Sequence, residues 1–267
     1  MLTPFVLLLS ILATAVLLRL YLRERARRRQ RPLIGDWPIR TANLEQLDPV
    51  FRAGPFGPGL ETEVAFVFNG PYNVQGGTTD LEAWILAVLA NSARQMFEFG
   101  TCTGKTAYLW ARNSPASARV TTLTLPPQGT SEYVEGAEDD AAETRTALSE
   151  SRFATFLYTG TAAEGKIEQL FGDSKSLSVA RWAGSCDLVF VDGSHAYSYV
   201  VSDSEKALEL VRPGGLVLWH DYAGPGHSRG VYRALNELSG RIPLVRIDGT
   251  KFVAYRRPPE ALTPPSA

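Results

Sequence analysis

Cysteine is scarce in this sequence of 267 residues, which contains only Cys102 and Cys186. The two lie far apart, and neither belongs to a Cys-x-x-Cys motif or to a cluster of cysteines and histidines. A disulfide framework needs several cysteines, and a structural zinc site needs four ligands. The sequence therefore predicts neither, and both cysteines are expected to be small buried residues.

The chain also lacks the excess of positive charge that is typical of nucleic-acid-binding proteins. Its formal net charge is -1, but seven arginines and one glutamate lie between Arg19 and Arg31. That segment carries +6, so the remainder carries about -7, since -1 minus 6 is -7. A mildly acidic body argues against a nucleic-acid partner. Hydrophobic residues make up 45% of the chain, which is enough for a sizeable core.

One long apolar run is present, at residues 2–18, and no basic residue precedes it. A cleaved signal peptide would have a basic start and a site of small residues after the run, whereas here Arg19 and further arginines follow. The run predicts an uncleaved transmembrane anchor over residues 1–22. By the positive-inside rule, the protein would be a single-pass membrane protein whose main domain is cytoplasmic.

The rest of the chain divides by composition into three parts. Residues 23–77 combine the basic flank with segments rich in proline and glycine, and we expect a linker and an irregular lead-in there. Residues 78–257 show helical and strand patterns in alternation, which predicts an α/β domain with a mostly parallel sheet covered by helices on both sides. A hairpin is expected around Asp248–Gly249, and residues 258–267 are expected to be a disordered tail.

Polar residues gather where the predicted strands end. In parallel sheets, ligands bind beyond the carboxyl ends of the strands, near the point where the strand order reverses. The candidate site is therefore expected at five strand ends: Glu98–Gly104, Thr124–Pro127, Asp173–Ser174, Asp192–His195 and His220–Tyr222.

The first of these segments, EFGTCTGKT, contains Gly-Lys-Thr and invites comparison with a nucleotide triphosphate loop. Such a loop has four residues between its first glycine and Gly-Lys, whereas Gly100 and Gly104 enclose three. Phe99 also stands where an earlier glycine would be needed. We therefore expect a tight strand-to-helix turn with an acid, Glu98, at the end of the strand.

Taken together, FEFGTCTGKTAYLW, TLTLPP, GDS, DLVFVDGSHAYSYVVSDSEKALELVRPGG and LVLWHDY resemble the class I S-adenosylmethionine-dependent methyltransferases. The resemblance covers about Thr79 to Arg257 and is greatest to the small-molecule O-methyltransferases of the catechol, macrocin and cephalosporin types. It implies a Rossmann-like, doubly wound sheet of seven strands, mostly parallel, with an antiparallel strand in the C-terminal hairpin.

The resemblance also implies roles for individual residues. Those expected to bind S-adenosylmethionine are Glu98, Gly100, Thr101, Gly104, Thr124, Asp173, Ser174 and Asp192. His195, Asp192 and His220 are the expected catalytic residues, and Asp192 with Asp221 is the expected ligand pair for Mg²⁺. Methyl transfer to oxygen needs a base near neutral pH or a metal ion, and histidine and paired carboxylates suit these two roles.

Two residues depart from the family pattern: Cys102 replaces a usual glycine, and Thr124 replaces a usual acid that binds the ribose hydroxyls. They keep open a non-catalytic binding module with a weakened cofactor site as the alternative to a membrane-anchored O-methyltransferase acting on a small molecule. A nicotinamide oxidoreductase is disfavoured because the first turn lacks a third glycine and carries Glu98.

Overall fold

The computed structural model describes residues 2–28, 37–52, 62 and 77–260. The chain divides into two units, Met1–Pro38 and Ile39–Ala267, which are described separately. Residues 261–267, which make up most of the predicted disordered tail, lie outside the described residues, as does much of the predicted lead-in.

The first unit contains one helix, α1 (Leu2–Arg28). Among the described residues, no helix combines the length and the apolar character needed to cross a bilayer. The uncharged run in α1 has seventeen residues and is followed by Arg19, whereas a span needs about twenty apolar residues. The predicted transmembrane anchor is therefore wrong, and so is the prediction of a single-pass protein with a cytoplasmic main domain.

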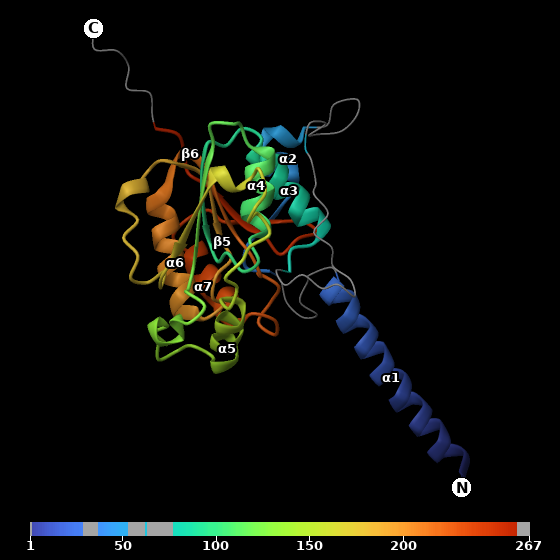
Figure 1. The fold of residues 1–267 in the computed structure, drawn as a ribbon. Helices are drawn as coiled ribbons and strands as arrows, with labels where there is room; N and C mark the ends of the chain where they lie inside the picture. The colour runs from blue at the N-terminus through green and yellow to red at the C-terminus, as the bar shows by residue number, and fades with distance from the viewer. Residues whose placement is uncertain (1, 29–36, 53–61, 63–76, 261–267) are drawn as a thin grey trace. The chain divides into compact units, whose positions relative to one another are not determined.

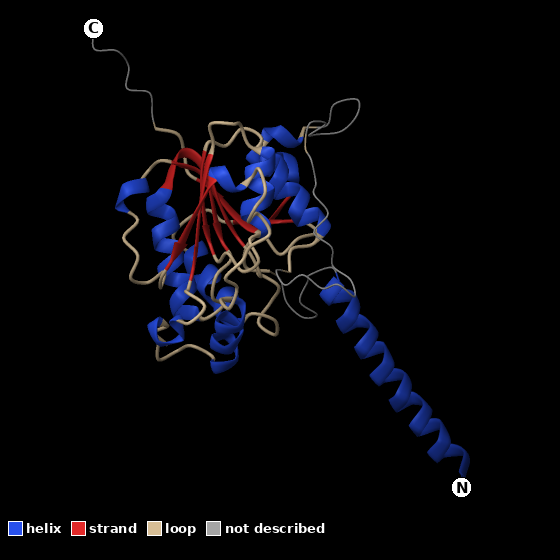
Figure 2. Cartoon of the chain, viewed as in Figure 1, coloured by secondary structure: helices blue, strands red, loops and turns tan. Residues whose placement is uncertain are grey.

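The second unit is built on one mixed sheet, which is drawn in red in Figure 2. Its strand order is β1-β7-β8-β6-β5-β2-β3-β4. Only β8 runs antiparallel to its neighbours, β6 and β7. The strands are β1 (Thr41–Ala42), β2 (Gln95–Phe99), β3 (Arg119–Thr124), β4 (Ile167–Phe171), β5 (Cys186–Val191), β6 (Val211–Trp219), β7 (Val245–Ile247) and β8 (Val253–Arg256).

Helices cover both faces of this sheet (Figure 1). Helices α3 and α4 pack together on one face, and α6 and α7 pack together on the other. The helices of this unit are α2 (Leu44–Leu47), α3 (Asp80–Ala90), α4 (Lys105–Asn113), α5 (Ala141–Glu150), α6 (Tyr197–Leu210) and α7 (Arg229–Ser239), with 3-10 turns at Pro49–Phe51, Gly129–Glu132, Glu164–Lys166 and Ala180–Trp182.

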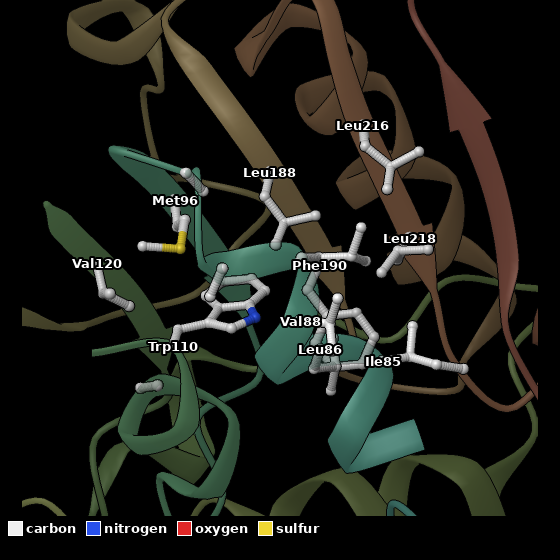
Figure 3. Close-up of a cluster of buried hydrophobic side chains, with 14 of the residues drawn as sticks. Ile85, Leu86, Val88, Met96, Trp110, Val120, Leu188, Phe190, Leu216 and Leu218 are labelled. Carbon is white, nitrogen blue, oxygen red and sulfur yellow. The ribbon is translucent and has the colours of Figure 1, made fainter. Parts of the chain in front are cut away.

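The core on the α3/α4 side explains why these strands are apolar on that face. Trp110 of α4 and side chains of α3 pack against alternate residues of β2, β3, β5 and β6 (Figure 3). The labelled members of this cluster are Ile85, Leu86, Val88, Met96, Trp110, Val120, Leu188, Phe190, Leu216 and Leu218. On the opposite face, the indole N–H of Trp219 donates to Ser204 of α6 at 2.9 Å. Burial on both faces accounts for the nearly continuous apolar run of β5.

The strand order reverses beside β2. From β2 the chain continues to β3 and β4 on one side, and it then returns to form β5 and β6 on the other side. Since β2 and β5 are parallel neighbours on the two sides of this reversal, a ligand site is expected at their carboxyl ends, beyond Phe99 and Val191. The structure thus has the mostly parallel α/β sheet that the alternating pattern predicted and the Rossmann-like winding that the resemblance implied.

The sheet differs from the prediction by one strand. Seven strands were predicted, whereas the described part of the sheet has eight, because Thr41–Ala42 pairs in parallel with Arg246–Ile247 at the edge. Two residues are too short to show a strand periodicity in the sequence. The hairpin around Asp248–Gly249 is confirmed, with Val245 opposite Ala254 in antiparallel register.

Candidate active site

The loop after β2 is a strand-to-helix turn shaped by glycine. Gly100 has a φ of 98°, and a Cβ on it would lie 2.1 Å from the carbonyl oxygen of Asp192. Gly104, with a φ of 80°, precedes the first residue of α4. Cys102 also adopts a left-handed backbone, with a φ of 45°, which is uncommon for a residue with a side chain. The close approach of Gly100 to Asp192 brings the loops after β2 and β5 into contact.

Lys105, the lysine of Gly-Lys-Thr, is held by a contact within the protein. Its buried ammonium group donates a hydrogen bond to the carbonyl oxygen of Thr78 at 3.0 Å, at the start of α3. Burial lowers the pKa of Lys105, although the charges of Asp80 and Glu82 oppose that change. The lysine therefore joins α4 to α3.

Glu98 lies beneath the turn, within the sheet. Its side chain is 1% exposed, and its Oε2 accepts a hydrogen bond from the hydroxyl of Thr122 at 2.6 Å. Burial raises the pKa of Glu98 to about 8, and the nearby charge of Asp192 acts in the same direction. Thr101 is also buried, and its hydroxyl lies 2.7 Å from that of Thr122. These residues form a polar support under the loop.

A small, partly open pocket lies at the carboxyl ends of β2, β3, β4 and β5. Five of the eight residues predicted to bind the cofactor line it: Gly100, Thr124, Asp173, Ser174 and Asp192. The other three, Glu98, Thr101 and Gly104, do not belong to its lining.

The two departures from the family pattern, Cys102 and Thr124, both line this pocket. Burial raises the pKa of the Cys102 thiol to about 12, so the thiol is neutral at physiological pH. Thr124 offers a hydroxyl at the end of β3, and its carbonyl oxygen accepts a hydrogen bond from the N–H of Gly172 at 2.9 Å. Neither side chain prevents a pocket from forming.

Next to the pocket, carboxylates and imidazoles form a network that we call the acid–imidazole cluster: Glu82, Asp192, His195, His220, Asp221, His227 and Lys251. Asp192 belongs to both the pocket lining and the cluster, since its Oδ1 lies 3.1 Å from Nδ1 of His220. The structure therefore brings together the residues predicted for catalysis, His195, Asp192 and His220, and joins them to the predicted cofactor pocket.

Asp221 is the centre of this cluster. Its Oδ2 lies 2.9 Å from Nε2 of His195 and 3.3 Å from Nδ1 of His220. Its Oδ1 accepts a hydrogen bond from Nζ of Lys251 at 3.0 Å and lies 3.5 Å from Nε2 of His227. Burial would raise the pKa of Asp221, but the charge of His220 and these nitrogen contacts hold it well below its usual value. Asp221 therefore stays ionised.

The same contacts raise the pKa values of His195 and His220. Burial would lower the pKa of His195, but the hydrogen bond to Asp221 and its charge raise it above the usual value. Burial would also lower the pKa of His220, but the charges of Asp221 and Asp192 outweigh that effect and raise its pKa well above 6.5. His195 has a 20% exposed side chain, so it is the histidine of the pair that a substrate can reach.

Asp192, His220 and Asp221 each offer an atom within 4.8 Å of one another, so we tested whether they suit the predicted Mg²⁺. Mg²⁺ prefers octahedral coordination by oxygen. Both oxygens of Asp221 already face nitrogen groups, and the ring of His220 lies between the two aspartates. This donor set does not fit Mg²⁺, and no catalytic step is derived through a metal.

Sequence reasoning missed several residues of the site. Glu82 and Lys251 belong to the cluster although they lie outside the strand ends that signalled the site. Glu150 and Tyr133 line the pocket from the region between β3 and β4. Burial raises the pKa of Glu150, while the charge of His195 opposes it. Only the helical pattern around Glu150 was visible in the sequence, so no local signal identified these four residues.

Solved structures with a similar arrangement include O-methyltransferases. One is the O-methyltransferase TomG from Streptomyces achromogenes, which is involved in tomaymycin synthesis and was crystallised with S-adenosylmethionine. Its sequence is 21% identical, the match covers 68% of this chain and 82% of TomG, and the TM-score is 0.43. Another is the O-methyltransferase from Bacillus cereus in complex with S-adenosylhomocysteine, at 17% identity, 65% and 77% coverage and a TM-score of 0.42. Likenesses of this size do not assign an activity to the chain.

A comparison with curated proteins finds no match to this sequence. A family model does match, over residues 97–222, and it describes a methyltransferase domain. The matched span begins within β2 and ends just after β6, so it contains the whole pocket lining and four of the seven cluster residues. The part of the chain that forms the pocket is therefore similar to a methyltransferase domain.

Proposed function

We propose that the protein transfers a methyl group from S-adenosylmethionine to a hydroxyl oxygen of a small molecule. The observation that carries this proposal is the double position of Asp192, which lines the pocket and contacts the acid–imidazole cluster. A cofactor in the pocket and an acceptor beside the cluster would therefore meet at one place. Such contiguity is what a direct displacement requires.

The pocket suits the cofactor by its chemistry. Gly100 gives a ligand access to the backbone where a Cβ would collide with Asp192. Thr124 offers a hydroxyl, and Asp173 and Ser174 supply polar groups at the far side of the pocket, after β4. When bound, S-adenosylmethionine supplies a methyl group that is activated by a sulfonium charge. We assign Glu98, Thr101 and Gly104 to the support of the loop that holds it.

His195 is the proposed general base. Because Nε2 of His195 faces the ionised Asp221 at 2.9 Å, the proton of the neutral ring belongs on Nε2 and the lone pair on Nδ1. Nδ1 is then the atom that accepts a proton from the acceptor hydroxyl, and Asp221 stabilises the imidazolium that forms. Asp192, whose carboxylate His220 contacts at 3.1 Å, aligns the acceptor between the pocket and this base.

Calorimetric titration of the full chain with S-adenosylhomocysteine tests the cofactor assignment. We expect binding in the wild type and at least about tenfold weaker binding after Ser174→Ala together with Asp173→Asn, because polar contacts of the pocket are removed. A chain that binds no S-adenosylhomocysteine at millimolar concentration would contradict the proposal. It would favour the alternative of a non-catalytic module, in which Cys102 and Thr124 have weakened the cofactor site.

A further inference from the structure

We propose that Glu82 is a positioning residue of the methyl-transfer site: it holds the ring of His220 between Asp192 and Asp221, where the ring takes the place of a divalent cation between the two carboxylates. The proposal rests on the proposed function for its reaction, but it concerns residues whose arrangement is independent of the acceptor.

Glu82 lies in the first turn of α3 and reaches the cluster from outside the matched methyltransferase span. Its Oε2 accepts hydrogen bonds from the N–H of Thr79 at 2.8 Å and from the Thr79 hydroxyl at 3.0 Å. Its Oε1 accepts the N–H of Lys251, from the loop between β7 and β8, at 2.7 Å. With 0% exposure and two backbone partners far apart in sequence, the carboxylate has a fixed position.

The third neighbour of this carboxylate is His220. Nε2 of His220 lies 3.4 Å from Oε2 of Glu82, on the opposite side of the ring from the two aspartates. The ring also packs beside Phe190 and Phe252, with centroid distances of 6.1 Å and 5.4 Å. An imidazole with a carboxylate facing each nitrogen and aromatic rings beside it has one favoured orientation. Glu82 therefore selects the orientation that presents Nδ1 to Asp192 and Asp221.

The ring does what a bridging cation would do for the two aspartates. Nδ1 lies 3.1 Å from Oδ1 of Asp192 and 3.3 Å from Oδ2 of Asp221, so one nitrogen faces both side chains. Lys251 approaches the remaining oxygen of Asp221. Two carboxylates this close would repel each other without a positive partner between them. The cluster supplies that partner from the protein itself.

Glu82→Gln tests the role of Glu82 because it keeps the size and the ability to cap α3 while removing the charge. Asp80→Asn is the matched control, since it removes a carboxylate from the same turn, where Asp80 is exposed. Ring ¹⁵N signals of His220 in the full chain are expected to move in Glu82→Gln and to stay unchanged in Asp80→Asn. In a transfer assay, Glu82→Gln should lower kcat about tenfold with little change in KM for S-adenosylmethionine.

Titration of the full chain with MnCl₂, followed by electron paramagnetic resonance of free Mn²⁺, tests the replacement of the cation. The wild type is expected to bind no Mn²⁺ at micromolar concentration. His220→Asp exchanges the ring for oxygen ligands, so it should bind Mn²⁺ at least about tenfold more tightly than the wild type.

Tight Mn²⁺ binding by the wild type would overturn the proposal, as would unchanged His220 signals in Glu82→Gln. If His220→Asp does not fold, the wild-type titration and the Glu82→Gln signals still decide the matter. Calorimetry with S-adenosylhomocysteine on the same samples separates the two proposals, because a failure to bind it contradicts the proposed function and leaves the Mn²⁺ and ring measurements valid.

Discussion

His195 and His227 both approach Asp221, but they differ in what surrounds them. The side chain of His195 is 20% exposed and lies next to Asp192, whereas that of His227 is 43% exposed and lies 3.5 Å from the other oxygen of Asp221. A general base has to be held in one orientation, and the closer, less exposed ring meets that condition.

We expect His195→Ala to lower kcat by about a hundredfold or more, which is the usual contribution of a general base. His227→Ala is the matched control and should have a much smaller effect, because it removes a histidine from the same aspartate without removing the base. The measurement is methyl transfer from tritium-labelled cofactor at saturation. Equal losses in the two variants would mean that the base is assigned to the wrong residue.

Glu98 gives a prediction of stability against pH. Its pKa is about 8 in the folded chain and near 4.5 when unfolded, so folding takes up a proton between these values. The stabilisation is complete below pH 4.5 and is lost as the pH rises toward 8. The glutamine in Glu98→Gln cannot ionise. Between pH 4.5 and pH 8, the free energy of unfolding of this variant should therefore rise relative to that of the wild type, by at most about 1.4 kcal/mol per pH unit.

Urea unfolding at several pH values measures this difference. Glu135→Gln, at an exposed position, is the control and should follow the pH dependence of the wild type. If the Glu98→Gln and wild-type curves stay parallel between pH 4.5 and pH 8, Glu98 is ionised inside the protein and the role given to burial is wrong.

At the scale of elements, the turn between β2 and α4 depends on glycine for two separate reasons at Gly100. Its φ of 98° is unfavourable for other residues, and its Cα faces the Asp192 carbonyl oxygen so closely that a Cβ would lie 2.1 Å away. Gly160 has a similar φ of 74°, but no atom lies within 4 Å of the position that a Cβ would take there. Substitution of Gly160 therefore tests backbone strain alone, whereas substitution of Gly100 adds a collision with Asp192.

We expect Gly160→Ala to cost about 1 kcal/mol of stability through strain alone and to leave the affinity for S-adenosylhomocysteine unchanged. Gly100→Ala should cost more, and it should also weaken that affinity at least about tenfold, because the loops after β2 and β5 have to separate. Thermal unfolding and calorimetry measure the two effects. Equal behaviour of the two variants would show that the contact with Asp192 is unimportant.

The sequence predicted most elements of the second unit because each has a strong local signal. Thr79 and Glu82 form a capping box at the start of α3, and α4 spans the short amphipathic segment Lys105–Asn113. Buried parallel strands such as β5 appear as apolar runs. Elements that have neither a hydrophobic periodicity nor a capping residue, such as β1, can be recognised only from their pairing in the folded sheet. The apolar run of α1 was interpreted by composition alone, and that interpretation failed.

For the whole molecule, the segment from Ile39 to Phe51 belongs to the folded unit that follows it. The N–H of Arg246 donates to the carbonyl oxygen of Arg40 at 2.8 Å, and β1 extends the sheet beside β7. Leu47 and Phe51 are buried in the core, and Asp48 forms an ion pair with Arg256. The predicted start of the domain at residue 78 leaves these contacts out.

A chain that begins at residue 39 should therefore melt within about 2 °C of the full chain, since it keeps the second unit whole. A chain that begins at residue 78 should melt many degrees lower, because the removal of a buried leucine and a buried phenylalanine alone costs about 5 kcal/mol or more. Differential scanning calorimetry decides between them. Identical transitions for the two shortened chains would show that β1 and its neighbours add nothing to the fold.

The candidate site was predicted in part, and the missing part has a physical reason. Asp192, His195, His220 and Asp221 follow two adjacent strands, so the strand ends located them. Glu82 and Lys251 join the same cluster through a hydrogen bond between residues 169 positions apart. Only the complete packing of α3 against the hairpin of β7 and β8 makes them neighbours, and no local pattern in the sequence indicates a contact between residues so far apart in the chain.

The hydrogen bond between Lys251 and Glu82 has a consequence for folding during translation. Lys251 is synthesised after every other residue of the acid–imidazole cluster, and until it docks, neither Glu82 nor Asp221 has its full set of partners. A nascent chain can thus complete its central strands and even its pocket while the acceptor side stays unassembled. Competence for methyl transfer would arise only after the hairpin of β7 and β8 has been synthesised and has closed against α3.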